Sequence, residues 1–182
     1  MRMQEAISAG IHRGILYAML EEGQIERLSR GLYRISDLPA LGRPDFTTVA
    51  YKAPNAIICL ISALHFHEIT NEVPHEVQIA IARKATPPRI DYPPTRVFIF
   101  SGEAFKSGIE THIIDGKPIR IYSAAKTVSD CFKYRNKIGL DVAIEALRMY
   151  LRSSKANIAE LLASAKICRV QKVITPYIRG QL

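Results

Sequence analysis

The chain has 182 residues, of which 48% are hydrophobic and 23% charged, so it can bury a core, and its composition is neither disordered nor fibrous. No stretch reaches the roughly 18 consecutive apolar residues that a membrane span requires, and no basic segment leads into an apolar signal core at the N-terminus. We therefore expect a cytoplasmic protein that has no membrane partner. Three cysteines at wide, irregular spacing argue against a disulfide framework or a cysteine-based zinc site.

The charge is basic and unevenly distributed. Lys and Arg number 25 against 17 Asp and Glu, a formal net charge of +8, which favours polyanionic partners. Residues 1–36 carry five Arg and four Glu, residues 37–130 carry ten bases and ten acids, and residues 131–182 carry ten bases and three acids. The C-terminal excess predicts a basic surface of Lys133, Arg135, Lys137, Arg148 and Arg152. Such a surface would face phosphates or an acidic partner, although surplus bases on outward helix faces also serve for solvation alone.

The first predicted element is a helix of about three turns that starts near Ile11 and stops at Gly23. Apolar residues recur at three- and four-residue spacing along it, namely Ile11, Ile15, Leu16, Met19 and Leu20. Two short β-prone runs follow, 25–28 and 32–35, joined by a turn in which Gly31 can take a positive φ. The breakers Pro39, Gly42 and Pro44 then predict a linker, so we place a domain boundary near residue 45.

In the remaining chain, the residue pattern predicts mainly strands before Ser123 and helices after it. Ser62 is expected to cap a short helix through His67, and strands are expected at 77–82 and 97–100. The strongest hairpin signal is Asp115-Gly116 between the runs 109–114 and 119–122, because Asp-Gly accepts the φ values of a type I′ turn. From Ser123 onwards, helical periodicity covers 125–137, 140–152, 158–167 and 170–178. The fold class is therefore α+β, in which a mixed or antiparallel sheet domain is followed by a helical C-terminal part.

A helix followed at once by a hairpin is typical of the second half of a winged helix-turn-helix. In that geometry the helix places its N-terminal residues at base edges in the major groove, and the wing contacts phosphates. The base-edge candidates are His12, Arg13 and Tyr17, and the phosphate candidates are Arg27, Arg30 and Arg34. The structural alternative is that these are exposed polar residues on a helix and hairpin that bind nothing.

Two further groups of residues have the composition of a metal or catalytic site, but their spacing favours structural roles. Cys59, His65, His67 and His75 include ligand types that suit zinc, but His65 and His67 diverge on a helix, so we expect hydrogen-bonding histidines and no metal. Ser123 and Lys126 have the Ser-x-x-Lys spacing of serine acyl-enzymes without their companion motifs. An N-cap at Ser123 and an ion pair of Lys126 with Asp130 explain them better. We expect neither enzymatic activity nor a cofactor.

A set of segments along the chain matches the pattern of a known family. The first are Ala9-Gly10-Ile11-His12, Leu16-Tyr17 and the run from Gly23 to Arg34. The others are residues 58–64, 67–70, 74–77 and, most specifically, 123–137. Through these segments nearly the whole chain resembles the AbiEi-type antitoxins of bacterial type IV toxin-antitoxin systems. The resemblance implies an N-terminal winged helix that represses the operon by binding operator repeats of double-stranded DNA. It also implies a C-terminal domain that counteracts a nucleotidyltransferase toxin.

One departure from that pattern concerns the start of the chain. Winged-helix domains normally begin with a further helix, and only about ten residues precede Ile11. We therefore expect the first helix to be missing, through an internal start of the chain. The domains are then a partial winged helix-turn-helix at 1–45 and an α+β antitoxin domain at 46–182. The predicted function is an antitoxin that represses its own operon, and the alternative is a protein-interaction module with antitoxin activity but no autonomous DNA binding.

Overall fold

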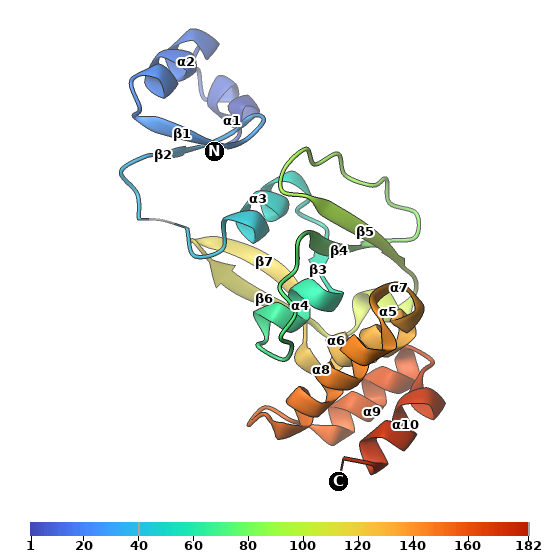
Figure 1. The fold of residues 1–182 in the computed structure, drawn as a ribbon. Coiled ribbons are helices and arrows are strands. Elements are labelled where there is room, and N and C mark those ends of the chain that lie inside the picture. The colour runs from blue at the N-terminus through green and yellow to red at the C-terminus, as the bar shows by residue number, and fades with distance from the viewer. Residues whose placement is uncertain (40, 182) are drawn as a thin grey trace.

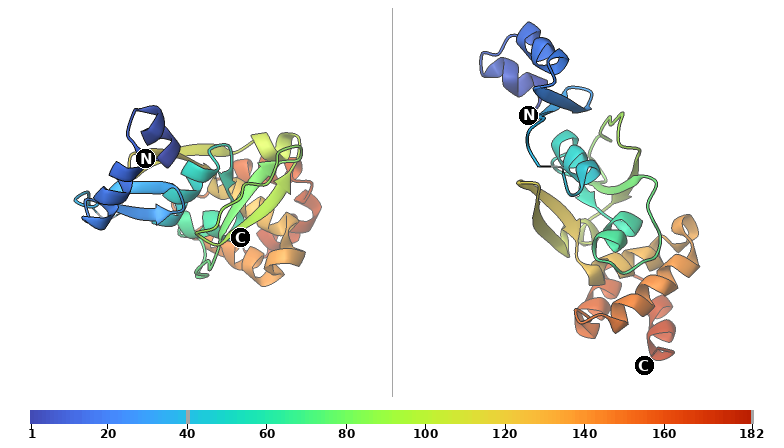
Figure 2. Two further views of the ribbon diagram at one scale, coloured as in Figure 1. Left: turned by 90° about the horizontal axis from the view of Figure 1, so that it is seen from above. Right: turned by 60° about the vertical axis from the view of Figure 1, so that its left-hand side comes forward.

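The computed structural model describes residues 1–39 and 41–181. They form an N-terminal unit, a central sheet and a C-terminal group of helices, which follow one another along an elongated molecule (Figure 1). The turned views in Figure 2 show the N-terminal unit standing off one end of the sheet, at the opposite end from the C-terminal helices.

The N-terminal unit contains two helices and a hairpin: α1 (Met3–Ser8), α2 (Arg13–Glu21), β1 (Ile25–Ser29) and β2 (Leu32–Ile35). It has a small core of its own, in which Ala6, Leu16, Ile25 and Tyr33 are buried. The expected absence of a first helix is corrected in part, because the six residues of α1 do form a helix ahead of α2. Together the two helices and the hairpin fit a partial winged helix-turn-helix.

The hairpin of this unit follows the sequence prediction closely. Ile25 pairs with Ile35 and Ser29 with Leu32, with a bulge between Arg27 and Ser29. Gly31 has a φ of +73°, a conformation that costs glycine little because it has no Cβ. The turn is thus where the sequence places it.

The central sheet has five strands in the order β5-β4-β3-β7-β6. Its elements are α3 (Pro44–Lys52), β3 (Ile57–Ile58), α4 (Leu60–Phe66), β4 (Val77–Ala82), β5 (Thr95–Phe100), α5 (Glu103–Lys106), β6 (Ile109–Ile114) and β7 (Lys117–Tyr122). The sheet is mixed, because β4 pairs with β5 and β3 with β7 in parallel, whereas β3–β4 and β6–β7 are antiparallel. This confirms the α+β class.

The prediction that Ser62 caps a helix is wrong. Helix α4 begins at Leu60, with Cys59 as its N-cap residue, so Ser62 lies inside it. The Ser62 hydroxyl accepts a hydrogen bond from the Gln78 backbone N–H (2.9 Å) and donates one to the Glu76 carbonyl (3.2 Å). It therefore ties α4 to the start of β4 instead of starting a helix.

The turn between β6 and β7 connects the sheet to the segment after the N-terminal unit. Asp115 and Gly116 have φ values of +52° and +70°, as a type I′ turn requires. The Asp115 carboxylate accepts hydrogen bonds from the Gly42 N–H (2.9 Å), the Arg43 N–H (3.4 Å) and the Thr47 hydroxyl (2.9 Å). Burial alone would raise the pKa of Asp115, but these hydrogen bonds lower it below its ordinary value.

Five helices make the C-terminal part: α6 (Ala124–Lys133), α7 (Arg135–Ile138), α8 (Leu140–Arg152), α9 (Ile158–Ile167) and α10 (Gln171–Arg179). The main core joins the strand residues Ile57, Phe98 and Tyr122 to helix residues such as Val128 and Leu147. A second core on the other side of the sheet contains Phe46 and Val49 of α3. The sheet is thus covered by α3 on one side and by the C-terminal helices on the other.

Inside the main core lies a buried ion pair. Lys126 and Asp130 are one helical turn apart on α6 with fully buried side chains, and the Lys126 ammonium contacts the Asp130 carboxylate. The Lys126 Nζ lies 4.2 Å from the centroid of the Tyr122 ring, and the Cys168 thiol donates a hydrogen bond to Asp130 Oδ1 (3.1 Å). Burial raises the pKa of Asp130, and the neighbouring Lys126 opposes that shift.

Candidate nucleic-acid interface

Helix α2 exposes the side chains that the sequence predicts for base contacts. Arg13 and Tyr17 are both exposed, Tyr17 by 51%, and they lie one turn apart on the same helix face. His12 is the N-cap residue, since its Nδ1 accepts a hydrogen bond from the Gly14 N–H (3.1 Å). The cap fixes the orientation of the exposed His12 ring, so His12 has a structural role in addition to the predicted one.

The hairpin presents two of the three arginines predicted for phosphate contacts. Arg27 and Arg30 are exposed. The turn that carries Arg30 is held by neighbouring elements, because the Met3 N–H donates to the Gly31 carbonyl (2.9 Å) and the Lys52 ammonium contacts the Arg30 carbonyl. This arrangement brings Lys52 of α3 beside the turn, a cation that sequence reasoning missed because its helix was not expected.

The prediction of a phosphate contact for Arg34 does not fit the structure. Its guanidinium pairs with Glu26 Oε1 (2.8 Å) and donates to the Leu38 carbonyl (2.8 Å), and it also contacts the Pro39 carbonyl. Only 12% of the Arg34 side chain is exposed. Because its donors already bind the carboxylate and carbonyls of its own chain, Arg34 anchors the segment that leaves the hairpin.

The predicted basic surface of the C-terminal part is divided. Lys133 and Arg135 line a hollow of about 550 Å³ together with Arg169, and Arg135 also donates to the Phe132 carbonyl (2.8 Å) at the end of α6. Lys137 lines a different hollow. The last two predicted residues, Arg148 and Arg152, are exposed four positions apart on α8.

The histidines and cysteines of the rejected zinc constellation do not come together. Among the described residues, no three His, Cys, Asp or Glu side chains are placed to hold a metal ion. His67 forms a hydrogen bond with the Tyr122 carbonyl (2.7 Å), and burial lowers its pKa. Cys59, Cys131 and Cys168 are buried, and burial raises the pKa of each thiol. A thiol with a raised pKa is a poor nucleophile near neutral pH.

The Ser-x-x-Lys pair has the structural role expected from its place on a helix. The Ser123 hydroxyl accepts the Lys126 backbone N–H (3.3 Å) as the N-cap of α6 and donates to Glu160 Oε1 (2.9 Å). The Lys126 ammonium pairs with Asp130. Ser123 is therefore a cap and Lys126 a partner in the buried ion pair.

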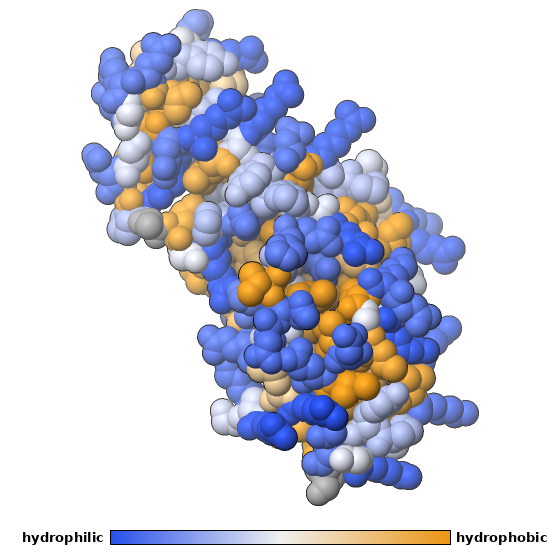
Figure 3. All heavy atoms as spheres, viewed as in Figure 1, coloured by the Kyte–Doolittle hydropathy of each residue, from blue (hydrophilic) through white to orange (hydrophobic). Residues whose placement is uncertain are grey.

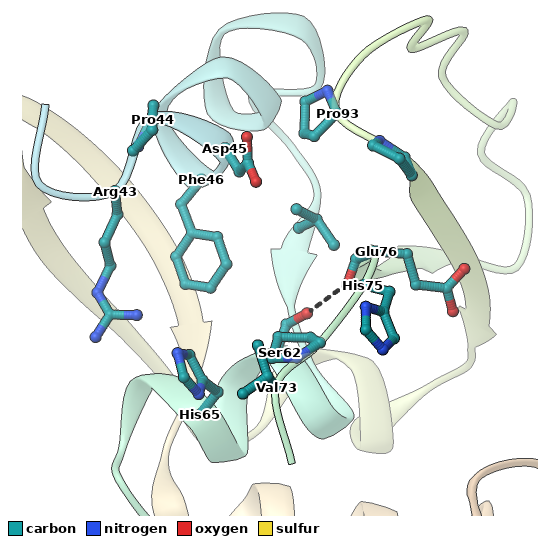
Figure 4. A pocket seen from close by; sticks show the side chains of 13 residues that line it. Arg43, Pro44, Asp45, Phe46, Ser62, His65, Val73, His75, Glu76 and Pro93 are labelled. Carbon is teal, nitrogen blue, oxygen red and sulfur yellow. Dashed lines mark hydrogen bonds between the residues drawn. The ribbon is translucent and has the colours of Figure 1, made fainter.

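A second concave site lies on the body of the protein, close to the start of α3. It is a hollow of about 180 Å³ whose lining includes Asp45, Phe46, His65, His75 and Pro93. Figure 4 shows that α3, α4 and the chain preceding β4 and β5 contribute these side chains, with Arg43 and Asp45 on opposite sides of the Phe46 ring. Burial raises the pKa of Asp45. Hydrogen-bonding histidines are expected from the sequence, which fits His67, but neither the His65 nor the His75 side chain forms a hydrogen bond with the described residues. Sequence reasoning missed Asp45 altogether.

Comparison with known proteins bears on the N-terminal unit. Residues 2–36 match the family described as transcriptional regulator, AbiEi antitoxin. This range contains both helices and the whole hairpin. No curated protein matches the chain. Within the described part of the chain, no helix is both long enough and apolar enough to cross a membrane. The N-terminal unit, which carries the exposed arginines of α2 and the hairpin, is therefore similar to the AbiEi antitoxin and transcriptional regulator family.

Proposed function

We propose that this protein is a type IV antitoxin that represses its own operon by binding operator repeats in double-stranded DNA through its N-terminal unit. The observation that carries the proposal is the exposure of Arg13 and Tyr17 on α2, next to a hairpin that exposes Arg27 and Arg30, within the segment that matches a transcriptional regulator family. In this proposal α2 enters the major groove and the hairpin lies along the backbone.

The two sets of residues have different tasks. Arginine pairs with the O6 and N7 acceptors of guanine through two parallel hydrogen bonds, so Arg13 at the first position of α2 is suited to read a base. Arg27 and Arg30 contact phosphates, which positions the protein without reading sequence. The α+β domain of residues 46–182 counteracts the nucleotidyltransferase-type toxin, and the protein acts in the cytoplasm by non-covalent binding, not by catalysis.

The test compares operator DNA with random duplex DNA for the full-length protein. Arg13→Ala should weaken operator binding by about 5- to 160-fold, which corresponds to about 1–3 kcal/mol for one bidentate base contact, and affect random DNA little. Arg30→Ala should weaken both DNAs and lower the slope of log K against log salt by about 0.9, because one counterion-releasing contact is lost. Arg83→Ala removes an exposed arginine from the loop after β4 and is the control. Equal losses on both DNAs from Arg13→Ala would contradict base reading by α2.

The competing function is a protein-interaction module that has antitoxin activity without DNA binding. The small charge excess of the N-terminal unit, five Arg against four Glu, favours this alternative, because non-specific DNA affinity depends on clustered bases. Growth of cells that express the toxin separates the two. A full-length protein that rescues growth but has no affinity for operator DNA would identify the interaction module.

A further inference from the structure

The hollow next to α3 borders a stretch of the chain in which acidic residues occur without basic ones. The segment 68–76 contains Glu68, Glu72 and Glu76 and no Lys or Arg, although the whole chain carries a net charge of +8. Glu76 lines the hollow, where it pairs with Arg96 (3.6 Å), and Asp45 adds a carboxylate from the first turn of α3. Among the described residues the Asp45 carboxylate has no cationic partner, and it therefore favours a cationic ligand.

Asp45 is the polar group best placed to bind such a ligand. Its side chain forms no hydrogen bond or ion pair with the described residues, although it is partly buried. Arg43 also lines the hollow, but its guanidinium carbon lies 5.7 Å from the Phe46 ring centroid and 5.1 Å from that of Phe66, and it forms no ion pair with Asp45. A carboxylate that is desolvated without a cationic partner gains most from a ligand with charged N–H donors.

The shape of the hollow limits the size of that ligand. Apolar groups form much of its wall, among them the buried residues Phe46, Val77 and Pro93. Its volume of about 180 Å³ is below the range of about 300–1,000 Å³ that encloses a drug-sized molecule. The space suits a single planar or extended side chain whose apolar stem rests on the walls while its charged end reaches Asp45.

The surroundings of the hollow indicate that this side chain belongs to a protein. Val73, at the rim, is 67% exposed. Figure 3 shows hydrophobic residues at the surface of this face, around the position of α4 and on toward α8, with charged residues around them. An apolar area rimmed by charge is typical of a protein interaction site.

We propose that this hollow is a docking site for an arginine side chain of a partner protein, with the guanidinium bound by the Asp45 carboxylate and neighbouring apolar residues of the partner covering Val73. This interaction is independent of the proposed DNA contacts, because neither α2 nor the hairpin contributes to the lining of the hollow. His65 and His75 line the same hollow and make no side-chain hydrogen bond to the described residues. Their imidazole rings would lie beside the bound ligand, so their NMR signals should shift when it binds.

The test uses N-acetyl-arginine-N-methylamide and the full-length protein, with imidazole NMR signals of His65 and His75 as the readout. The arginine compound should bind with a dissociation constant in the millimolar range, and its neutral isostere, the citrulline compound, at least tenfold more weakly. Asp45→Asn should weaken arginine binding at least tenfold. Asp141→Asn is the matched control, because Asp141 occupies the same second position of helix α8 and does not line the hollow; it should leave binding unchanged.

A second probe tests the apolar part of the proposal. The capped tripeptide Leu-Arg-Leu should bind more tightly than the single arginine, and Val73→Ser should remove that gain while leaving binding of the single arginine intact. Equal affinity for arginine and citrulline, or unchanged binding to Asp45→Asn, would overturn the proposal. So would tighter Asp45-dependent binding of guanosine or cytidine, which would identify the hollow as a nucleobase site.

Discussion

The buried pair of Lys126 and Asp130 offers a quantitative test of how the main core of the protein is stabilised. Both side chains are fully buried, and apart from Lys126 the described partner of the Asp130 carboxylate is the Cys168 thiol. Lys126→Met keeps the length of the side chain but leaves a desolvated carboxylate without its cation. Removing one partner of a buried pair costs about 3–5 kcal/mol. For a protein of this length, we expect Tm to fall by about 6–20 °C.

The double variant Lys126→Met/Asp130→Leu separates loss of the pair from loss of packing. Because it replaces both charges with apolar groups, it should recover most of the stability lost in Lys126→Met. Urea unfolding followed by circular dichroism measures all three proteins. Lys133→Met, at the exposed end of α6, should change stability by no more than about 0.5 kcal/mol.

The same variant has a pH signature with a defined sign. Burial raises the pKa of Asp130, and loss of Lys126 removes the charge that opposes this shift, so the folded variant binds a proton more tightly than the unfolded chain does. Its stability deficit should therefore shrink as the pH falls from 8 towards 5. A deficit that does not change with pH, or a double variant as unstable as the single one, would refute the coupling of the two side chains.

Three further predictions concern the N-terminal unit and its attachment. Arg34→Ala should lower the free energy of unfolding by about 1–2 kcal/mol, because its charged hydrogen bonds are lost. Unlike Arg30→Ala, it should leave the salt dependence of DNA binding unchanged. A reduced salt slope would show that Arg34 does contact phosphate. Gly31→Val should abolish amide-exchange protection in β1 and β2, because a β-branched residue resists a φ of +73°. Gly31→Asn should retain that protection, and equal effects of the two substitutions would contradict the backbone explanation. The pKa of Asp115 in the folded state lies below its ordinary value, so its contribution to stability is present near neutral pH and is lost as the pH falls through the folded pKa; Asp115→Asn should show no such loss in acid unfolding.

Elements set by local chemistry were predictable from the sequence. The turn at Asp115-Gly116 and the strand at 77–82 are found where the residues predict them, because turn preference and a short, mainly apolar run are properties of a few neighbouring residues. The sequence pattern places Pro44 in a linker, but it is the first residue of α3. Proline fits that position well, since its missing N–H would have no helical partner there, so the signal for α3 was present.

Roles that depend on distant contacts were not predictable. Nothing in the local sequence distinguishes Arg34 from Arg27 and Arg30. Its different role arises because the chain after the hairpin brings the Leu38 and Pro39 carbonyls to the Arg34 guanidinium, which binds them. Ser62 resembles a helix cap, but its hydroxyl bridges to β4. Asp45 has no motif around it and becomes notable only when the loop carrying His75 folds over α3 and α4.

The hydrogen bonds that hold the chain between the N-terminal unit and the sheet have a consequence for the spacing of the proposed operator repeats. Arg34 holds this segment at Leu38 and Pro39, and Asp115 holds it at Gly42 and Arg43. If the N-terminal unit reads DNA as proposed, a unit fixed in this way cannot rotate freely to reach a repeat on another side of the duplex. Two copies on neighbouring repeats would then depend on helical phase. Inserting five base pairs, about half a turn, would set their bodies on opposite sides of the DNA, whereas ten base pairs would restore their alignment.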